Sequence, residues 1–511
     1  MTRQYDNYAD LITFSRSSSG TALRPVSYGS ELVENGTFDS NLDSWNLIGG
    51  TASQVDGEAV ITYDGGNGGL AQYVSVTVGK VYRVTGEITS ATSPSPRFKI
   101  GSTNLGNDYA QYTATGRIDT VVVATTSTIS VFGQALTSGS IIIDNISVKE
   151  VIFDQPNTPL TLFNHPAGIP RIEYDADGNR LGLLIEESRT NLATYSEDFE
   201  QWVDVNTDLT ENAIEAPDGT TTATKLIADT ATGQHRRDYL STYSAGTYTF
   251  SVFAKVGGYN YLELRLAGDG VYVDIRDGSL AGASAGITTS YEDVGNGWKR
   301  IAITHSAGAN DTARINVVET SGQRSFAGDG TSGIYIYGAQ LEAGAFPTSY
   351  IPTSGATATR AADVASIPVS AFGYNQSEGT VVVEFESKIN SDLNYVWDLS
   401  FDSSNRMFSK ASITQNLRVI VGGANQANIT AVPDAGQFNK YAYAIKRDDM
   451  GLSKNGEAPT IDASGSIVEN PTTLQIGAAI NGTAGYLDGH IKSIKYFPRK
   501  LTAAQLQELT T

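Results

Sequence analysis

The chain has 511 residues, of which 40% are hydrophobic and 18% charged, and its formal net charge at pH 7 is −20. An acidic surface repels nucleic-acid phosphates and anionic lipid headgroups, so we expect no nucleic-acid binding and no membrane insertion. The chain contains no cysteine, which excludes disulfides and thiolate metal sites.

The N-terminal segment, residues 1–30, is interpreted as an arm that precedes the first folded unit. Its first ten residues, MTRQYDNYAD, lack the apolar core of a signal peptide. We therefore expect synthesis without a signal peptide, in the cytoplasm of the cell that makes the protein.

Apolar and polar residues alternate along most of the chain. Val74, Val76 and Val78 fall on one side of an extended segment, and glycine occurs 52 times in the sequence. Period-two spacing between glycine-rich turns is typical of half-buried strands. The pattern predicts an all-β fold of tandem antiparallel β-sandwiches (jelly rolls), with one short C-terminal helix.

Two stretches repeat one another and predict two sandwiches of similar design. Residues 31–151 open with ELVENGTF and reach Trp45, and residues 191–350 open with Asn191 and reach Phe199 and Trp202. Each stretch closes with a β-rich segment, 140–148 or 333–341. Because the two tryptophans occupy equivalent places, they are predicted to pack in a core or at its rim, with a ligand platform as the alternative, and Trp298 is interpreted as structural in the same way.

The remaining segments are a connector at 152–190, a linker at 351–362 and a third sandwich at 363–511. The last element is predicted to be the helix. Thr502 can cap it, with Gln505 three residues on in a capping-box arrangement.

Several motifs carry a resemblance to known families. The segments RLGLLIEESRTNLATYSEDFEQW (180–202) and GAQLEAGAFPTSYIPT (338–353), with Phe14-Ser15-Arg16 and PRIEYD (170–175), resemble the frame of a β-sandwich module of tailed-phage and prophage virion proteins. Residues 31–151 resemble carbohydrate-binding jelly rolls and read as an insertion into that module. Residues 363–511 resemble a concanavalin- or laminin-G-like sandwich. The motifs are expected to mark the scaffold, not a ligand site.

Tyrosines are the predicted glycan contacts, because aromatic rings cover the apolar faces of sugars at small entropic cost. Tyr259 and Tyr261 are two apart, and we expect them to share a strand face with Glu263 and Arg265. The alternative is that the tyrosines only cover the sandwiches. The candidates are Tyr63, Tyr109, Tyr112, Tyr259, Tyr261 and Tyr272.

The resemblance to carbohydrate-binding jelly rolls implies a structural Ca²⁺ held by Asp144, with Glu34 as a weaker partner. Tyr337 takes the place of Asp144 in the second repeat, so no matching site is expected there. Ca²⁺ takes about six to eight oxygen ligands, many of them backbone carbonyls, so the sequence leaves the shell incomplete.

The four histidines, His165, His235, His305 and His490, fall in no catalytic or metal signature. Glu384 and Glu386 are interpreted as an exposed pair facing an edge. We therefore predict a protein that is not an enzyme.

The resemblance implies a protein of the virion surface, in a tail fibre, tail tip or head spike. The favoured function is non-enzymatic adhesion to host surface polysaccharide. One alternative is a structural decoration or assembly protein without glycan affinity, and a less favoured one is a polysaccharide depolymerase. The implied partners are other virion proteins and further copies of the chain, with a trimer expected from the family.

Overall fold

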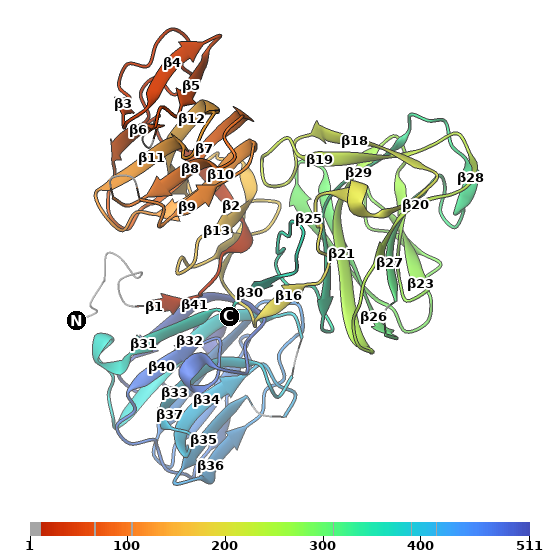
Figure 1. Cartoon of the computed structure of the whole chain (residues 1–511). Coiled ribbons are helices and arrows are strands. Elements are labelled where there is room, and N and C mark those ends of the chain that lie inside the picture. The colour runs from red at the N-terminus through yellow and green to blue at the C-terminus, as the bar shows by residue number, and fades with distance from the viewer. Residues whose placement is uncertain (1–11, 66–67, 104–105, 310, 390, 415) are drawn as a thin grey trace. The chain divides into compact units, whose positions relative to one another are not determined.

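A computed structural model of the chain describes residues 12–65, 68–103, 106–309, 311–389, 391–414 and 416–511. The described residues fold almost wholly into antiparallel strands, which confirms the predicted all-β fold (Figure 1). They form two compact units: one is Pro25–Pro159, and the other combines the chain up to Arg24 with Leu160–Thr511. No helix in these ranges is long and apolar enough to span a membrane. The first part of the predicted arm, residues 1–11, lies outside the described residues.

The unit Pro25–Pro159, here called the first jelly roll, contains the predicted module 31–151. Its strands are β2 (Gly20–Tyr28, shared with the other unit), β3 (Asn46–Leu47), β4 (Thr51–Val55), β5 (Glu58–Thr62), β6 (Gly68–Ser75), β7 (Val81–Ala91), β8 (Pro96–Gly101), β9 (Ala110–Tyr112), β10 (Gly116–Val123), β11 (Thr128–Ala135) and β12 (Ser140–Phe153). One sheet has the order β3-β6-β11-β8-β9 and the other runs β4-β5-β12-β7-β10. Alternate residues such as Ile129 and Val131 of one sheet and Ile141 and Ile143 of the other fill one core.

The second jelly roll follows the same plan with one more strand at the edge of each sheet. It contains the 3-10 turn η2 (Phe199–Gln201) and strands β17 (Val203–Val205), β18 (Thr207–Ile214), β19 (Ala223–Ala228), β20 (Thr232–Leu240), β21 (Gly246–Gly257), β22 (Tyr261–Leu266), β23 (Asp269–Asp274), β24 (Leu280–Ala281), β25 (Thr288–Gly295), β26 (Trp298–Ala307), β27 (Thr312–Val318), β28 (Ser325–Ala327) and β29 (Gly333–Ala343). The sheet orders are β17-β20-β27-β22-β23-β24 and β18-β19-β29-β21-β26-β25. The repeat seen in the sequence is therefore present in the strand order.

Two local features reinforce the repeat. Phe38 and Trp45 lie 5.0 Å apart between ring centroids in the first roll, and Phe199 and Trp202 lie 5.4 Å apart in the second. All three tryptophans interpreted as structural are buried, with exposed fractions of 8% for Trp45, 3% for Trp202 and 1% for Trp298. Their indole N–H groups donate to backbone carbonyls, as buried polar groups require.

The C-terminal sandwich draws strands from three parts of the sequence. They are β1 (Thr13–Ser15), β14 (Ile172–Tyr174), β15 (Arg180–Ile185), β31 (Val364–Pro368), β32 (Glu378–Ser387), β33 (Tyr395–Asp402), β34 (Asn405–Lys410), β35 (Leu417–Val421), β36 (Ala424–Ile429), β37 (Asn439–Lys446), β38 (Met450–Lys454), β39 (Thr460–Asp462), β40 (Thr473–Ile476) and β41 (Gly489–Phe497), with 3-10 turns η3 (Val369–Ala371) and η4 (Ile480–Gly482). Its sheets have the orders β1-β31-β40-β33-β34-β35-β36 and β14-β15-β41-β32-β37-β38-β39.

The connector 152–190, which resembles part of the phage-type module, contributes its strands β14 and β15 to a sheet of the C-terminal sandwich. The reason is apolar burial, because Leu183 and Ile185 of β15 belong to the core of that sandwich. Three short strands join the parts: β13 (Leu160–His165), β16 (Arg189–Asn191) and β30 (Ala358–Arg360), of which β16 pairs with β30.

The predicted helix is α1 (Ala503–Thr510). Thr502 caps it, and both hydrogen bonds of the capping box with Gln505 are present. Leu501 and Leu506 pack together against Val382 and Ala442 of the C-terminal sandwich, so the helix covers part of one sheet.

Candidate functional site

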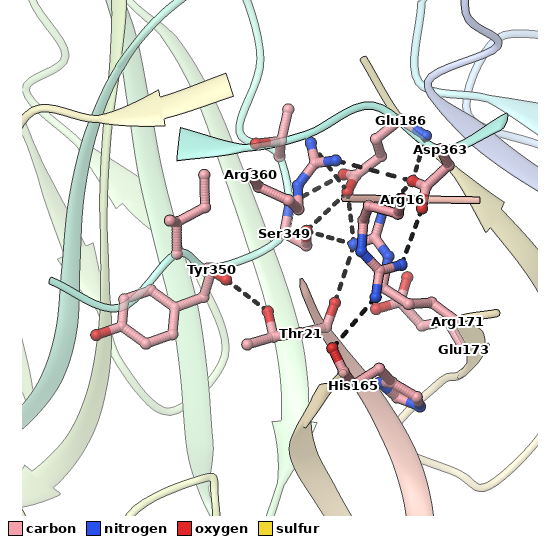
Figure 2. A network of polar contacts seen from close by, with 12 residues as sticks. Arg16, Thr21, His165, Arg171, Glu173, Glu186, Ser349, Tyr350, Arg360 and Asp363 are labelled. Atoms are coloured by element: carbon pink, nitrogen blue, oxygen red, sulfur yellow. Dashed lines mark hydrogen bonds and ion pairs between the residues drawn. The ribbon is translucent and has the colours of Figure 1, made fainter. Parts of the chain in front are cut away.

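Residues of the motifs that carry the resemblance meet Arg360 and Asp363 in a buried ion network within the larger unit (Figure 2). Arg16 lies 3.0 Å from Asp363, and Arg171 lies 2.9 Å from Glu186 and also pairs with Asp363. Arg360 lies 3.4 Å from Glu186. These side chains come from the arm, the connector, the linker and the first residue of the predicted third sandwich, so the network ties segments that are distant in sequence.

The network is buried from solvent and holds three arginines against two carboxylates. The side chains of Arg16, Arg171, Glu186 and Asp363 are all 0% exposed. Burial and the neighbouring Arg171 lower the pKa of Arg16 to about 10 despite the opposing effect of Asp363. Burial would raise the pKa of Glu186, but nearby arginines hold it well below its usual value. A closed network of this kind offers no surface to a ligand, so the motifs act as scaffold.

The best candidate for a ligand surface is the outward side of one sheet of the second jelly roll. Leu262 and Leu264 of β22 and Ile315 of β27 point into the core, so their neighbours in each strand point outward. The outward positions form rows across paired strands, and we call them the polar face: Arg236, Asp238, Tyr261, Glu263, Arg265, Tyr272, Arg314 and Asn316.

The floor of the polar face holds polar atoms without partners. Glu263 is 1% exposed and Asn316 is 0% exposed, and the two are cross-strand neighbours. Glu263 Oε1 accepts hydrogen bonds from Arg265 at 2.9 Å and Arg324 at 2.8 Å. Glu263 Oε2 and Asn316 Oδ1, in contrast, are buried and accept no hydrogen bond. An unsatisfied buried acceptor costs about 1–3 kcal/mol. A hydrogen bond from a hydroxyl group to either oxygen would therefore be favourable.

The rim of the polar face is made of arginines. Arg236 and Arg314 lie 2.9 Å and 3.4 Å from Asp238, and their side chains are 19% and 31% exposed. Arg324, from the segment between β27 and β28, is 33% exposed and stacks over Tyr272. Arg276 stacks over Tyr261 in the same way. The face thus combines a buried acceptor floor, two tyrosines and a cationic rim open to solvent.

The structure separates the predicted tyrosines into two groups. Tyr261 and Tyr272 lie on the polar face with Glu263 and Arg265, in the predicted register. Tyr259 precedes β22 and packs against the core and Phe326, so it does not join them.

The three tyrosines of the first roll are partly buried against its core. The Tyr109 hydroxyl accepts from the Thr125 N–H, and the Tyr112 hydroxyl donates to the Asp119 carbonyl. The Tyr63 N–H donates to the Gly139 carbonyl. These contacts fit the alternative in which Tyr63, Tyr109 and Tyr112 cover the sandwich.

Sequence reasoning missed Asn316, Arg314, Arg324 and Asp238. They come from β20, β27 and the segment after β27, which are distant from β22 in sequence. The only local signal was the alternation of arginine with apolar residues in these strands.

The implied Ca²⁺ position at Asp144 fits a cation in two respects. Asp144 Oδ1 is buried and accepts no hydrogen bond. Burial, then the charges of Glu58, Asp39 and Glu87, raise the pKa of this carboxyl, so the surroundings carry an excess of negative charge. The other proposed ligand, Glu34, is exposed, and its carboxylate accepts a hydrogen bond from Ser44 at 2.7 Å.

The second roll differs at the corresponding place. Tyr337 stands there, buried, and burial followed by the charge of Glu197 raises its pKa well above the usual value. A bulky neutral ring fills the position that Asp144 has in the first roll.

Comparisons with known proteins gave only distant structural likenesses. No protein-family model matches the chain, and no curated protein matches it. Among solved structures, the N-terminal CBM22-1–CBM22-2 tandem domain of Paenibacillus barcinonensis Xyn10C is similar with a TM-score of 0.21 and 13% identity, covering 62% of this chain and 97% of that one. Trypanosoma rangeli sialidase in complex with the inhibitor DANA is similar with a TM-score of 0.23 and 10% identity, covering 96% of this chain and 94% of that one.

Proposed function

We propose that this protein adheres to glycans through the polar face of its second jelly roll, without cleaving them. The observation that supports this is the pair of unpartnered acceptors, Glu263 Oε2 and Asn316 Oδ1, on a floor flanked by tyrosines and arginines. Sugar hydroxyls donate to carboxylate and amide oxygens, and aromatic rings pack against sugar C–H faces.

The resemblance of the motifs to phage virion modules suggests where adhesion would act. We propose a virion-surface location and a host surface polysaccharide as the partner, with several copies of the chain in one assembly. One shallow site binds weakly, and repetition of the site raises avidity by about 10²–10⁴.

The test uses affinity electrophoresis to measure how the full chain binds a panel of purified neutral and acidic surface polysaccharides. The informative variant is Asn316→Leu, which removes the floor amide. Its matched control is Gln134→Leu, because Gln134 lies on the corresponding strand of the first roll and also has a buried, unpartnered side-chain oxygen.

We expect Asn316→Leu to weaken binding by roughly tenfold and Gln134→Leu to leave it unchanged. The reverse result would move the site to the first roll. Absence of binding to every polysaccharide would favour a structural decoration or assembly protein, and release of reducing ends would indicate a depolymerase.

A further inference from the structure

We infer that the ligand of the polar face is an acidic glycan whose sugar ring carries a carboxylate beside free hydroxyls. This inference rests on the proposed function and adds the chemical class of the ligand. It depends on the charges of the face, on their arrangement across strands and on the acceptors beneath them.

Positive charge gathers on this face in a chain that is strongly acidic. The whole sequence has 55 acidic residues and 35 lysines and arginines. The polar face and its rim reverse that balance, with five arginines against three carboxylates: Arg236, Arg265, Arg276, Arg314 and Arg324 against Asp238, Glu263 and Asp274. The excess of cations attracts an anion, and a guanidinium presents a fork that matches a carboxylate.

Two of these arginines face each other directly. Arg265 of β22 and Arg314 of β27 are register partners, so their Cβ atoms are about 5 Å apart. Like charges at directly opposed positions repel, and an anion between them removes that cost. The Nε atoms of Arg265 and Arg324 are buried without a hydrogen-bond partner, which leaves donors for the oxygens of the anion.

The stem of Arg265 fills the space above a glycine. Gly270 is the register partner of Arg265 on β23, and a Cβ at that position would lie 2.6 Å from Cγ of Arg265. The missing side chain leaves room for the stem of Arg265 between two strands. The row Asp238, Arg314, Arg265, Gly270 therefore has three charged members and one with no side chain.

Donors and acceptors alternate over neighbouring rows. The arginine row lies beside the row that contains Asn316 and Glu263, whose free oxygens accept from hydroxyl groups. A sugar acid presents the complementary pattern, since one ring bears both a carboxylate and hydroxyls. Arg324 lies over Glu263, so the ligand displaces the exposed part of this side chain to reach the floor.

The experiment compares polymers that differ only in charge. Polygalacturonate, alginate and hyaluronan are each tested beside the same polymer after chemical reduction of its carboxylates to alcohols, with dextran sulfate as a further anion. The proteins are the full chain, Arg314→Gln, Arg324→Gln and the control Arg447→Gln. Arg447 is an exposed arginine of the C-terminal sandwich, 3.8 Å from Glu469, so this control removes the same charge elsewhere. Equal thermal unfolding midpoints verify that the variants are folded.

We expect at least one acidic polymer to bind roughly tenfold or more tightly than its reduced form, and Arg314→Gln and Arg324→Gln to remove that preference while Arg447→Gln keeps it. Equal binding of acidic and reduced forms would overturn the inference and leave the proposed function standing. Stronger binding of dextran sulfate than of any carboxylated polymer would also overturn it. Failure of every polymer, acidic or neutral, would overturn both.

Discussion

The two jelly rolls have the same strand order but present different outward faces. In the second roll, the outward side of the sheet containing β27 holds a buried carboxylate and amide under a rim of arginines. In the first roll, the corresponding strand β11 presents Phe132, which is 1% exposed, with Lys99 5.2 Å from its ring centroid. Gly69 lets this ring lie flat, because a Cβ there would be 2.2 Å from it. Inward residues give the two rolls the same architecture, and outward residues give each roll a different surface.

The rolls also differ in how they are anchored. The first is a compact unit by itself, whereas the second belongs to one unit with the C-terminal sandwich. The buried ion network lies in that larger unit, and so do all four histidines, since residues 25–159 contain none. Changes to these groups should therefore affect one unit and spare the other.

Loss of Asp363 should have the largest effect. Asp363→Ala leaves Arg16 and Arg171 buried with one fewer counter-charge, and we expect it to destabilise the larger unit by about 3–5 kcal/mol. Calorimetry should show the unfolding transition of this unit moving to lower temperature, while that of the first roll stays in place. A variant in which both transitions move together would contradict the division into independently stable units.

Alkaline pH should distinguish the units next. His490 is 4% exposed and bonds Glu386 at 2.8 Å and Glu173 at 2.7 Å. Burial opposes the charged imidazolium, but the two carboxylates outweigh it and raise the pKa of His490 to about 9. A raised pKa in the folded state stabilises the fold fully below the unfolded value of about 6.5, and this stabilisation is lost as pH rises through 9.

We therefore expect the larger unit to lose up to about 3 kcal/mol between pH 6.5 and 10 through this group. His490→Gln should remove most of that pH dependence, and the first roll serves as an internal control without histidine. The measurement is the free energy of unfolding in denaturant at several pH values. If the unfolding free energy of His490→Gln depended on pH as steeply as that of the unchanged protein, groups other than His490 would be responsible for the pH dependence.

Local pattern predicted much of this structure, because strand identity depends on neighbouring residues. The two-residue spacing placed Tyr261, Glu263 and Arg265 on one strand face, as the structure has them, although Tyr259 packs against the core instead. The C-terminal helix followed from Thr502 and Gln505 alone. The paired tryptophans were also predicted, since the repeat placed them in equivalent surroundings.

Strand order could not be predicted in the same way, because it depends on pairings between distant segments. Glu384 and Glu386 were interpreted as exposed and edge-facing, yet β32 lies between β41 and β37 and both carboxylates are half-buried beside Lys492 and His490. Asn316 escaped notice for the same reason, since only the register of β27 with β22 brings it to Glu263.

Calcium offers a smaller and more selective test of the first roll. If Asp144 holds the proposed Ca²⁺, the metal at 100 times its Kd should stabilise this roll by about 2.7 kcal/mol and leave the larger unit unchanged. Chelation should lower only the corresponding unfolding midpoint. Asp144→Asn should abolish the response, and Glu34→Gln measures whether that carboxylate contributes. A midpoint that is insensitive to Ca²⁺ would rule out the site.

The smallest effect concerns the bulge that both closing strands share. Register shifts follow Asp144 in β12 and accompany Tyr337 in β29, and the next residues, Asn145 and Gly338, have φ values of 56° and 61°. Gly338→Ala forces a side chain into the left-handed region, where its Cβ would lie 3.0 Å from Phe253 and 3.1 Å from Tyr350. We expect this change to cost about 1–2 kcal/mol.

Asn145→Gly is the reciprocal change in the first roll. Glycine adopts a positive φ more easily than asparagine, but the variant loses the hydrogen bond from Asn145 to Asp144 at 2.8 Å. The two effects oppose each other, so we expect a net change below about 1 kcal/mol in the unfolding free energy of the first roll. The contrary outcome is a large loss of unfolding free energy in Asn145→Gly with none in Gly338→Ala. It would mean that the Asn145 side chain, and not the backbone geometry, maintains the bulge. The two closing strands would then be equivalent in position only.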